Sequence, residues 1–116
     1  MASHARLFFL LTAVVYLSVV KEANAQADYK KCAGYFFVGL QCVTPQFRDA
    51  YRSAFMSMAR MNASQEGKPE PLTEDEAVQG LADTLREWQK LVGPRCESAS
   101  SIRDLYQDEC RQMLRQ

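Results

Sequence analysis

Four cysteines constrain how this 116-residue chain can fold more than any other feature. An even number of cysteines in a short chain is typical of an exported domain that is held together by disulfides. No two of them form a C-x2-C pair and no histidine lies near them in the sequence, so the pattern disfavours a zinc site. We therefore expect two disulfides and no bound metal among Cys32, Cys42, Cys96 and Cys110.

Residues 1–25 have the three regions of a cleavable secretory signal peptide. A positively charged start precedes an apolar run over residues 7–20, and Ala23 and Ala25 have the spacing of an A-x-A cleavage site. The run is too short for a membrane-spanning helix, which needs about 20 apolar residues. We expect cleavage after Ala25, secretion to the extracellular space without a stable membrane anchor, and a single domain over residues 26–116.

The composition of residues 26–116 excludes several classes of function. Positive and negative charges nearly balance and no basic stripe is present, so we expect no nucleic-acid partner. The single histidine of the chain, His4, belongs to the predicted signal peptide. With the cysteines paired as well, neither a Ser-His-Asp arrangement nor a cysteine nucleophile can form. We therefore expect a non-enzymatic protein without a cofactor.

Hydrophobic periodicity predicts helices over three segments of the chain. Apolar residues recur at helical spacing over residues 45–61, 74–92 and 101–114. The middle segment begins with a capping box, in which Thr73 is followed three residues later by Glu76. These segments predict an all-α protein with short connections between its helices.

Residues 27–43 are harder to assign. Gly34 and Gly39 lower the helix propensity, and the sequence YFFV between them is equally compatible with a buried strand. The length of the segment, and the lack of a strand partner elsewhere in the sequence, favour a helix. We expect a small disulfide-stapled up-down four-helix bundle, with helices near residues 27–43, 45–61, 74–92 and 101–114.

Helical geometry selects one of the three possible disulfide pairings. If residues 27–43 are helical, Cys32 and Cys42 lie about 15 Å apart along the axis. A disulfide spans Cα atoms within about 7 Å, so these two cysteines cannot pair. An up-down bundle brings Cys42 and Cys96 to one pole, and Cys32 and Cys110 to the other. The expected bonds are Cys32–Cys110 and Cys42–Cys96.

A polar loop that contains proline and glycine is expected over residues 62–71. It begins with Asn62-Ala63-Ser64, the acceptor sequence for N-glycosylation. Because an exposed loop of an exported protein favours modification, we expect a glycoprotein with sugar on Asn62.

Binding is the function that these exclusions leave, and the first form of it is an extracellular ligand or effector that engages a protein partner. If Phe36 faces the core, its neighbours Tyr35 and Phe37 cannot both do so. An exposed aromatic side chain on a rigid helix can anchor an interface. We therefore expect Tyr35 and Phe37 to contribute to a partner-binding surface.

The alternative form is a carrier that holds a small apolar ligand within the bundle. Methionine and aromatic side chains can line an adaptable pocket. A cavity inside the bundle would favour the carrier, whereas a filled core with the two aromatic residues exposed would favour the protein partner. The candidate pocket residues are Phe47, Phe55, Met58, Trp88 and Met113.

Overall fold

The computed structural model describes residues 27–115, so the signal peptide predicted over residues 1–25 lies outside the described residues. Five α-helices and one 3-10 turn, with no strand, make up the described part. The predicted all-α class is therefore confirmed. The elements are α2 (Tyr29–Cys42), η1 (Pro45–Phe47), α3 (Arg48–Gln65), α4 (Glu74–Gly80), α5 (Ala82–Val92) and α6 (Ala99–Leu114).

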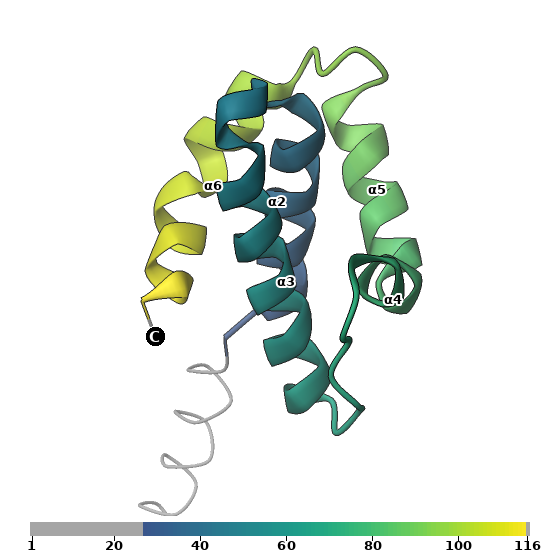
Figure 1. The fold of residues 1–116 in the computed structure, drawn as a ribbon. Helices are drawn as coiled ribbons and strands as arrows, with labels where there is room; N and C mark the ends of the chain where they lie inside the picture. Colours follow the sequence, from purple (N-terminus) through teal and green to yellow (C-terminus); the bar gives the residue numbers. More distant parts are fainter. Residues whose placement is uncertain (1–26, 116) are drawn as a thin grey trace, which may run out of the picture.

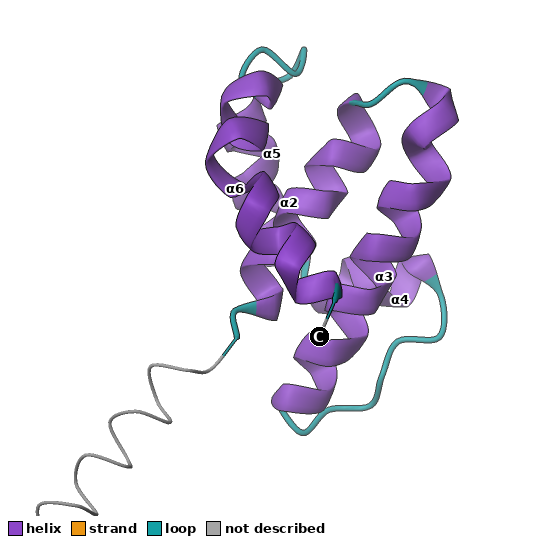
Figure 2. Ribbon diagram, turned by 90° about the vertical axis from the view of Figure 1, so that its left-hand side faces the viewer, coloured by secondary structure: helices purple, strands orange, loops and turns teal. Residues whose placement is uncertain are grey.

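The helical segments alternate in direction around a central helix. α2 and α3 run side by side through the middle, with α5 on one flank and α6 on the other (Figure 1). α2 packs against α3, α5 and α6, whereas α4 packs against α3 and α5. The connections lie toward the two ends of the bundle, and the longest one leaves the lower end of α3 (Figure 2).

The central place of α2 explains its unusually apolar sequence. Every residue from Cys32 to Val38 is buried, because neighbouring helices cover α2 on more than one side. A helix that is apolar around its whole circumference is typical of such a position. Tyr35 is only 4 % exposed and Phe37 only 8 %. The expectation that Tyr35 and Phe37 form an exposed surface is therefore wrong, since it assumed a helix with one buried face.

Two glycines allow aromatic side chains to approach α2 closely. Trp88 of α5 lies over Gly34, and Tyr51 of α3 lies over Gly39, so a Cβ atom at either glycine would overlap the ring. Glycine costs about 1 kcal/mol of helix propensity relative to alanine. Here the closer packing of the neighbouring helices offsets that cost. The glycines that weakened the helix prediction are thus part of the reason that α2 can be central.

Several helix boundaries differ from those predicted. α2 covers Tyr29–Cys42, whereas the predicted helix covered residues 27–43. α3 begins at Arg48, after η1, and continues to Gln65, whereas the predicted helix covered residues 45–61. The single helix predicted over residues 74–92 is two helices, because Leu81 leaves the helical conformation directly after Gly80. α6 begins at Ala99 rather than at residue 101. Glycine lowers helix propensity, which is consistent with the break between α4 and α5 directly after Gly80. The side chain of Leu81, at this break, is buried in the core.

The predicted capping box at the start of α4 is present in part, because Thr73 caps the helix but Glu76 binds the N–H of Leu72 and not that of Thr73. The Thr73 hydroxyl accepts a hydrogen bond from the Glu76 N–H at 3.2 Å. The Glu76 carboxylate accepts one from the Leu72 N–H at 2.9 Å. These bonds satisfy backbone donors that have no partner within the helix.

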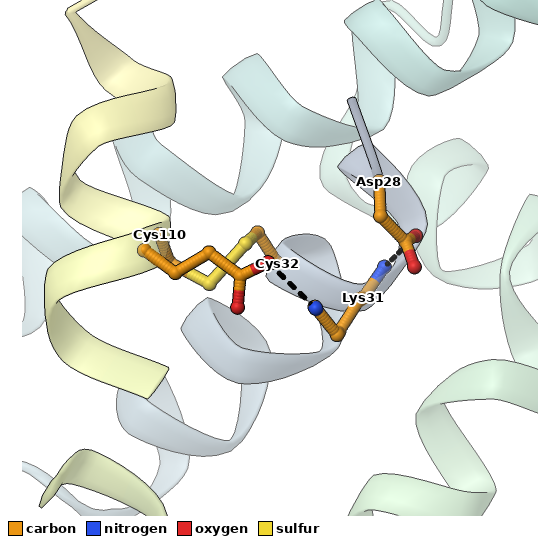
Figure 3. The surroundings of a disulfide bond; sticks show 5 residues. Asp28, Lys31, Cys32 and Cys110 are labelled. Atoms are coloured by element: carbon orange, nitrogen blue, oxygen red, sulfur yellow. Dashed lines mark hydrogen bonds and ion pairs between the residues drawn. A yellow bond between two sulfur atoms is a disulfide. The ribbon is translucent and has the colours of Figure 1, made fainter. Parts of the chain in front are cut away.

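The structure contains the two disulfides expected from helix geometry. Cys32–Cys110 joins α2 to α6 with its Cα atoms 5.3 Å apart (Figure 3). Cys42–Cys96 joins the end of α2 to the loop before α6, with Cα atoms 5.9 Å apart. Each bond closes a long loop, worth on the order of 4 kcal/mol in the chain-entropy model. Together they hold the last helix to the central one at both poles.

The start of α2 is held beside the Cys32–Cys110 disulfide. The Asp28 carboxylate accepts a hydrogen bond from the Lys31 N–H at 3.0 Å and so caps the helix. The Lys31 ammonium lies 2.6 Å from a carboxylate oxygen of Glu109 on α6. The hydrogen bond from this ammonium to Glu109 raises the pKa of Lys31, although partial burial opposes the rise. Figure 3 shows Asp28 and Lys31 next to the disulfide.

Candidate ligand-binding groove

Four of the five predicted pocket residues form the packed core of the bundle. Phe55 and Met58 have no exposed surface, and Trp88 and Met113 are nearly as buried. The rings of Phe55 and Phe37 pack with their centroids 5.3 Å apart. These side chains fill the space between the helices, where the alternative carrier hypothesis placed a cavity. The fifth residue, Phe47, lies apart from them and is 53 % exposed.

A groove of about 340 Å³ opens beside Phe47, at the pole of the Cys42–Cys96 disulfide. Its volume lies at the low end of the range of about 300–1,000 Å³ that is typical of small-molecule sites. The end of α2, the turn into α3 and the first turn of α6 contribute most of its lining. We call it the Phe47 groove, and its lining residues are Tyr35, Val38, Gly39, Cys42, Val43, Thr44, Phe47, Tyr51, Val92, Ala99, Ser100, Ile102 and Arg103.

The connection between α2 and α3 contributes one side of the groove. α2 ends at Cys42, and the next two residues, Val43 and Thr44, are extended. Pro45 then begins the η1 turn, as expected for proline at the first position of a helical turn. Phe47 ends this turn before α3 begins, so its ring is not drawn into the core with the apolar face of α3. Thr44, at the N-cap of this turn, makes no side-chain capping bond.

The polar groups of the groove are hydroxyls and one guanidinium. Burial raises the pKa of Tyr35 to about 12, and the neighbouring Tyr51 hydroxyl adds to this rise. The positive charges of Arg111 and Arg103 oppose part of the rise in the Tyr35 pKa. At neutral pH the Tyr35 hydroxyl is therefore a neutral hydrogen-bonding group beside positive charge.

The structure brings together some predicted site residues and separates others. Phe47 and Tyr35 both line the Phe47 groove, although they were predicted for different sites. Phe37 packs into the core and contributes to no surface. Sequence reasoning missed Arg103 and Ile102, which lie on the first turn of α6. The predicted Cys42–Cys96 bond could have indicated these two residues as site residues, because it places the start of α6 at the same pole as the end of α2.

Asn62 lies within α3 and not in the exposed loop that was predicted for it. Its side chain is only 6 % exposed. It lines a smaller groove of about 180 Å³ between α3, α4 and the loop that joins them. The exposed-loop argument for a sugar on Asn62 is therefore wrong, and glycosylation at this position stays a prediction that the folded conformation disfavours.

Within residues 27–115 no cluster of metal-ligating side chains is found, and no helix combines the length and the apolar character needed to cross a membrane. The Phe47 groove is the larger of the two grooves described here, and it combines an apolar lining with a few hydrogen-bonding groups. Such a combination is typical of a site that binds a small molecule. Comparison of the chain with models of protein families, with curated proteins and with solved structures finds no match.

Proposed function

We propose that this protein is a secreted binding protein that holds a small, largely apolar molecule in the Phe47 groove. The observation that carries the proposal is the groove itself, an apolar recess beside a half-exposed phenylalanine. A bound apolar molecule would remove the Phe47 ring and the aliphatic side chains around it from water, which is favourable at roughly 25 cal/mol per Å² buried.

The framework around the groove supports this proposal. The Cys42–Cys96 disulfide ties the end of α2 to the loop before α6, and both segments contribute lining residues. A site held in place before its ligand arrives loses less conformational entropy on binding. The two disulfides and the predicted signal peptide also support an oxidising, extracellular location.

No comparable surface supports a protein partner. The aromatic pair predicted for that role is buried. Large apolar side chains that are exposed on their own are normal on a protein surface and define no interface. Besides the half-exposed Phe47 itself, the large exposed apolar residues of the described part are Leu72, Leu91, Leu105 and Leu114, which lie on different elements or well apart on α6.

A pair of adjacent serines allows a direct test of the groove. Ser100 lines the groove, whereas Ser101 lies next to it on α6, is also exposed and does not line the groove. We expect 1-octanol to bind wild-type protein saturably, with NMR shifts at the end of α2, at η1 and at the start of α6. Ser100→Trp should abolish this binding by filling the groove, and Ser101→Trp should preserve it.

The proposal fails if 1-octanol causes no saturable shifts at these segments. It also fails if the two tryptophan variants bind 1-octanol equally well while both remain folded. Far-UV circular dichroism of both variants establishes that they remain folded.

A further inference from the structure

We infer that the natural ligand of the Phe47 groove is an amphipathic carboxylate, in which Arg103 binds the anionic group and the groove covers the apolar body. This inference rests on the proposed function, because it specifies the ligand of the same groove. It goes further than the proposed function because it assigns to Arg103 the recognition of the negative charge of the ligand.

One charged side chain lines the groove. Within residues 27–115, Arg103 is the only charged residue among those that line it. The acidic residues nearest to Arg103 in the sequence are Asp104 and Asp108 on its C-terminal side and Glu97 on its N-terminal side, and none of them lines the groove. The carboxylate of Glu97 instead accepts a hydrogen bond from the backbone N–H of Arg95. An anionic ligand in the groove would therefore meet a guanidinium without a competing carboxylate in the lining.

Arg103 is also free to bind such a ligand. Over residues 27–115 it takes part in no ion pair, whereas Arg52 and Arg86 are both paired with carboxylates. A guanidinium presents a planar array of N–H donors that matches a carboxylate in a bidentate arrangement. The unpaired guanidinium at the edge of an apolar groove thus fits a ligand with one carboxylate at its end.

The orientation of α6 adds to the positive potential at this end of the groove. The first turn of α6 lines the groove through Ala99 and Ser100, and no side chain caps this helix. The Ala99 N–H already donates to the Cys96 carbonyl at 3.1 Å, so it is the helix dipole that makes this helix start favourable for negative charge. The hydroxyl of Tyr35 already experiences the charge of Arg103, as the opposing effect on the Tyr35 pKa shows.

The apolar side chains limit the size of the ligand body. Val38, Val43, Phe47, Val92 and Ile102 supply most of the apolar lining. The groove of about 340 Å³ is half open and small, which suits a single short chain or one ring system. A short-chain carboxylate such as octanoate is therefore the appropriate probe, and it is ionised at neutral pH.

The test compares octanoate, 1-octanol and octylamine by NMR titration at low salt. We expect octanoate to bind about tenfold more tightly than 1-octanol, and octylamine to bind more weakly than 1-octanol. Arg103→Gln should lower the affinity for octanoate to that for 1-octanol, and it should leave 1-octanol binding unchanged. Arg103→Lys should restore part of the preference. The matched control is Arg95→Gln, which removes an exposed arginine at the same pole outside the groove lining and should change neither affinity.

The possible results separate this inference from the proposed function. If both octanoate and 1-octanol bind in the groove with equal affinity, the inference about Arg103 is overturned and the proposed function stands. An equal loss of octanoate binding in Arg103→Gln and Arg95→Gln also overturns it, because general charge attraction would then explain the preference. If neither molecule binds, both proposals are overturned.

Discussion

At position 34 the absence of a methyl group sets how closely α5 can approach α2. The indole of Trp88 occupies the place that a Cβ atom of residue 34 would need. At Gly80, by contrast, no atom lies within 4 Å of such a Cβ. Glycine is therefore needed for close helix packing at position 34, whereas a larger residue has room at position 80.

We expect Gly34→Ala to destabilise the protein by about 1–2 kcal/mol, since forcing extra volume into a packed core typically costs about 1–3 kcal/mol and the gain in helix propensity is about 1 kcal/mol. Gly80→Ala should be neutral or should stabilise the protein by up to about 1 kcal/mol. Urea unfolding of both variants measures the difference. Equal stability of the two variants would show that Trp88 does not restrict residue 34.

Individual side chains were also where sequence reasoning was least reliable. The buried residues Phe55, Met58, Trp88 and Met113 belong to the periodic apolar pattern, so their burial follows from the pattern. Tyr35 was misplaced because periodicity describes one helix and not the number of helices around it. A residue's exposure depends on neighbours that are distant in sequence, and local pattern alone does not contain that information.

Among the elements, the four helical segments were predicted at their observed places, but their ends, and the division of one segment into α4 and α5, were not. The helix predicted over residues 74–92 is interrupted after Gly80, where a single glycine weakened the pattern without marking a break. The capping box at Thr73 marked its start correctly, because a cap involves only neighbouring residues. Local signals of this kind can be read from the sequence, whereas a break that depends on packing cannot.

The two threonines at the N-cap positions of η1 and α4 give a matched pair for a stability test. Thr73 accepts a capping hydrogen bond from the N–H of Glu76, but Thr44 makes no such bond. We expect Thr73→Ala to destabilise the protein by about 1 kcal/mol, the usual cost of losing an N-cap. Thr44→Ala should have a much smaller effect on the unfolding free energy. Hydrogen exchange should also become faster in α4 of Thr73→Ala, and unchanged exchange there would contradict the role of the cap.

For the whole molecule, the pairing of the cysteines was the most informative prediction, because it fixed which helix ends lie at the same pole. The Phe47 groove was not predicted, although every segment around it was. Its shape depends on two extended residues and one 3-10 turn between α2 and α3. These residues have no periodic pattern. The predicted bundle therefore put them at the correct pole, but nothing in the sequence indicated the groove beside them.

The two disulfides should differ in their reactivity toward a mild reductant. Cys32 and Cys110 have no exposed surface, whereas Cys42 and Cys96 are only partly buried. Cys96 also has a φ of 58°, a backbone conformation that is unfavourable for residues other than glycine. We therefore expect alkylation after brief reduction to label Cys42 and Cys96 first, as mass spectrometry of the peptides would show. Earlier or simultaneous labelling of the other pair would contradict this order.

The position of α2 at the centre of the bundle has a consequence for biosynthesis. Chains emerge with their N-terminal segment first, so the most apolar helix of the domain is made before the helices that cover it. Its cysteines find their partners, Cys96 and Cys110, only when the last part of the chain has arrived. The one pair available earlier, Cys32 with Cys42, is held apart once α2 is helical. Both native bonds must therefore wait until Cys96 and Cys110 have been made, and a Cys32–Cys42 bond formed earlier would have to break before α2 could be completed.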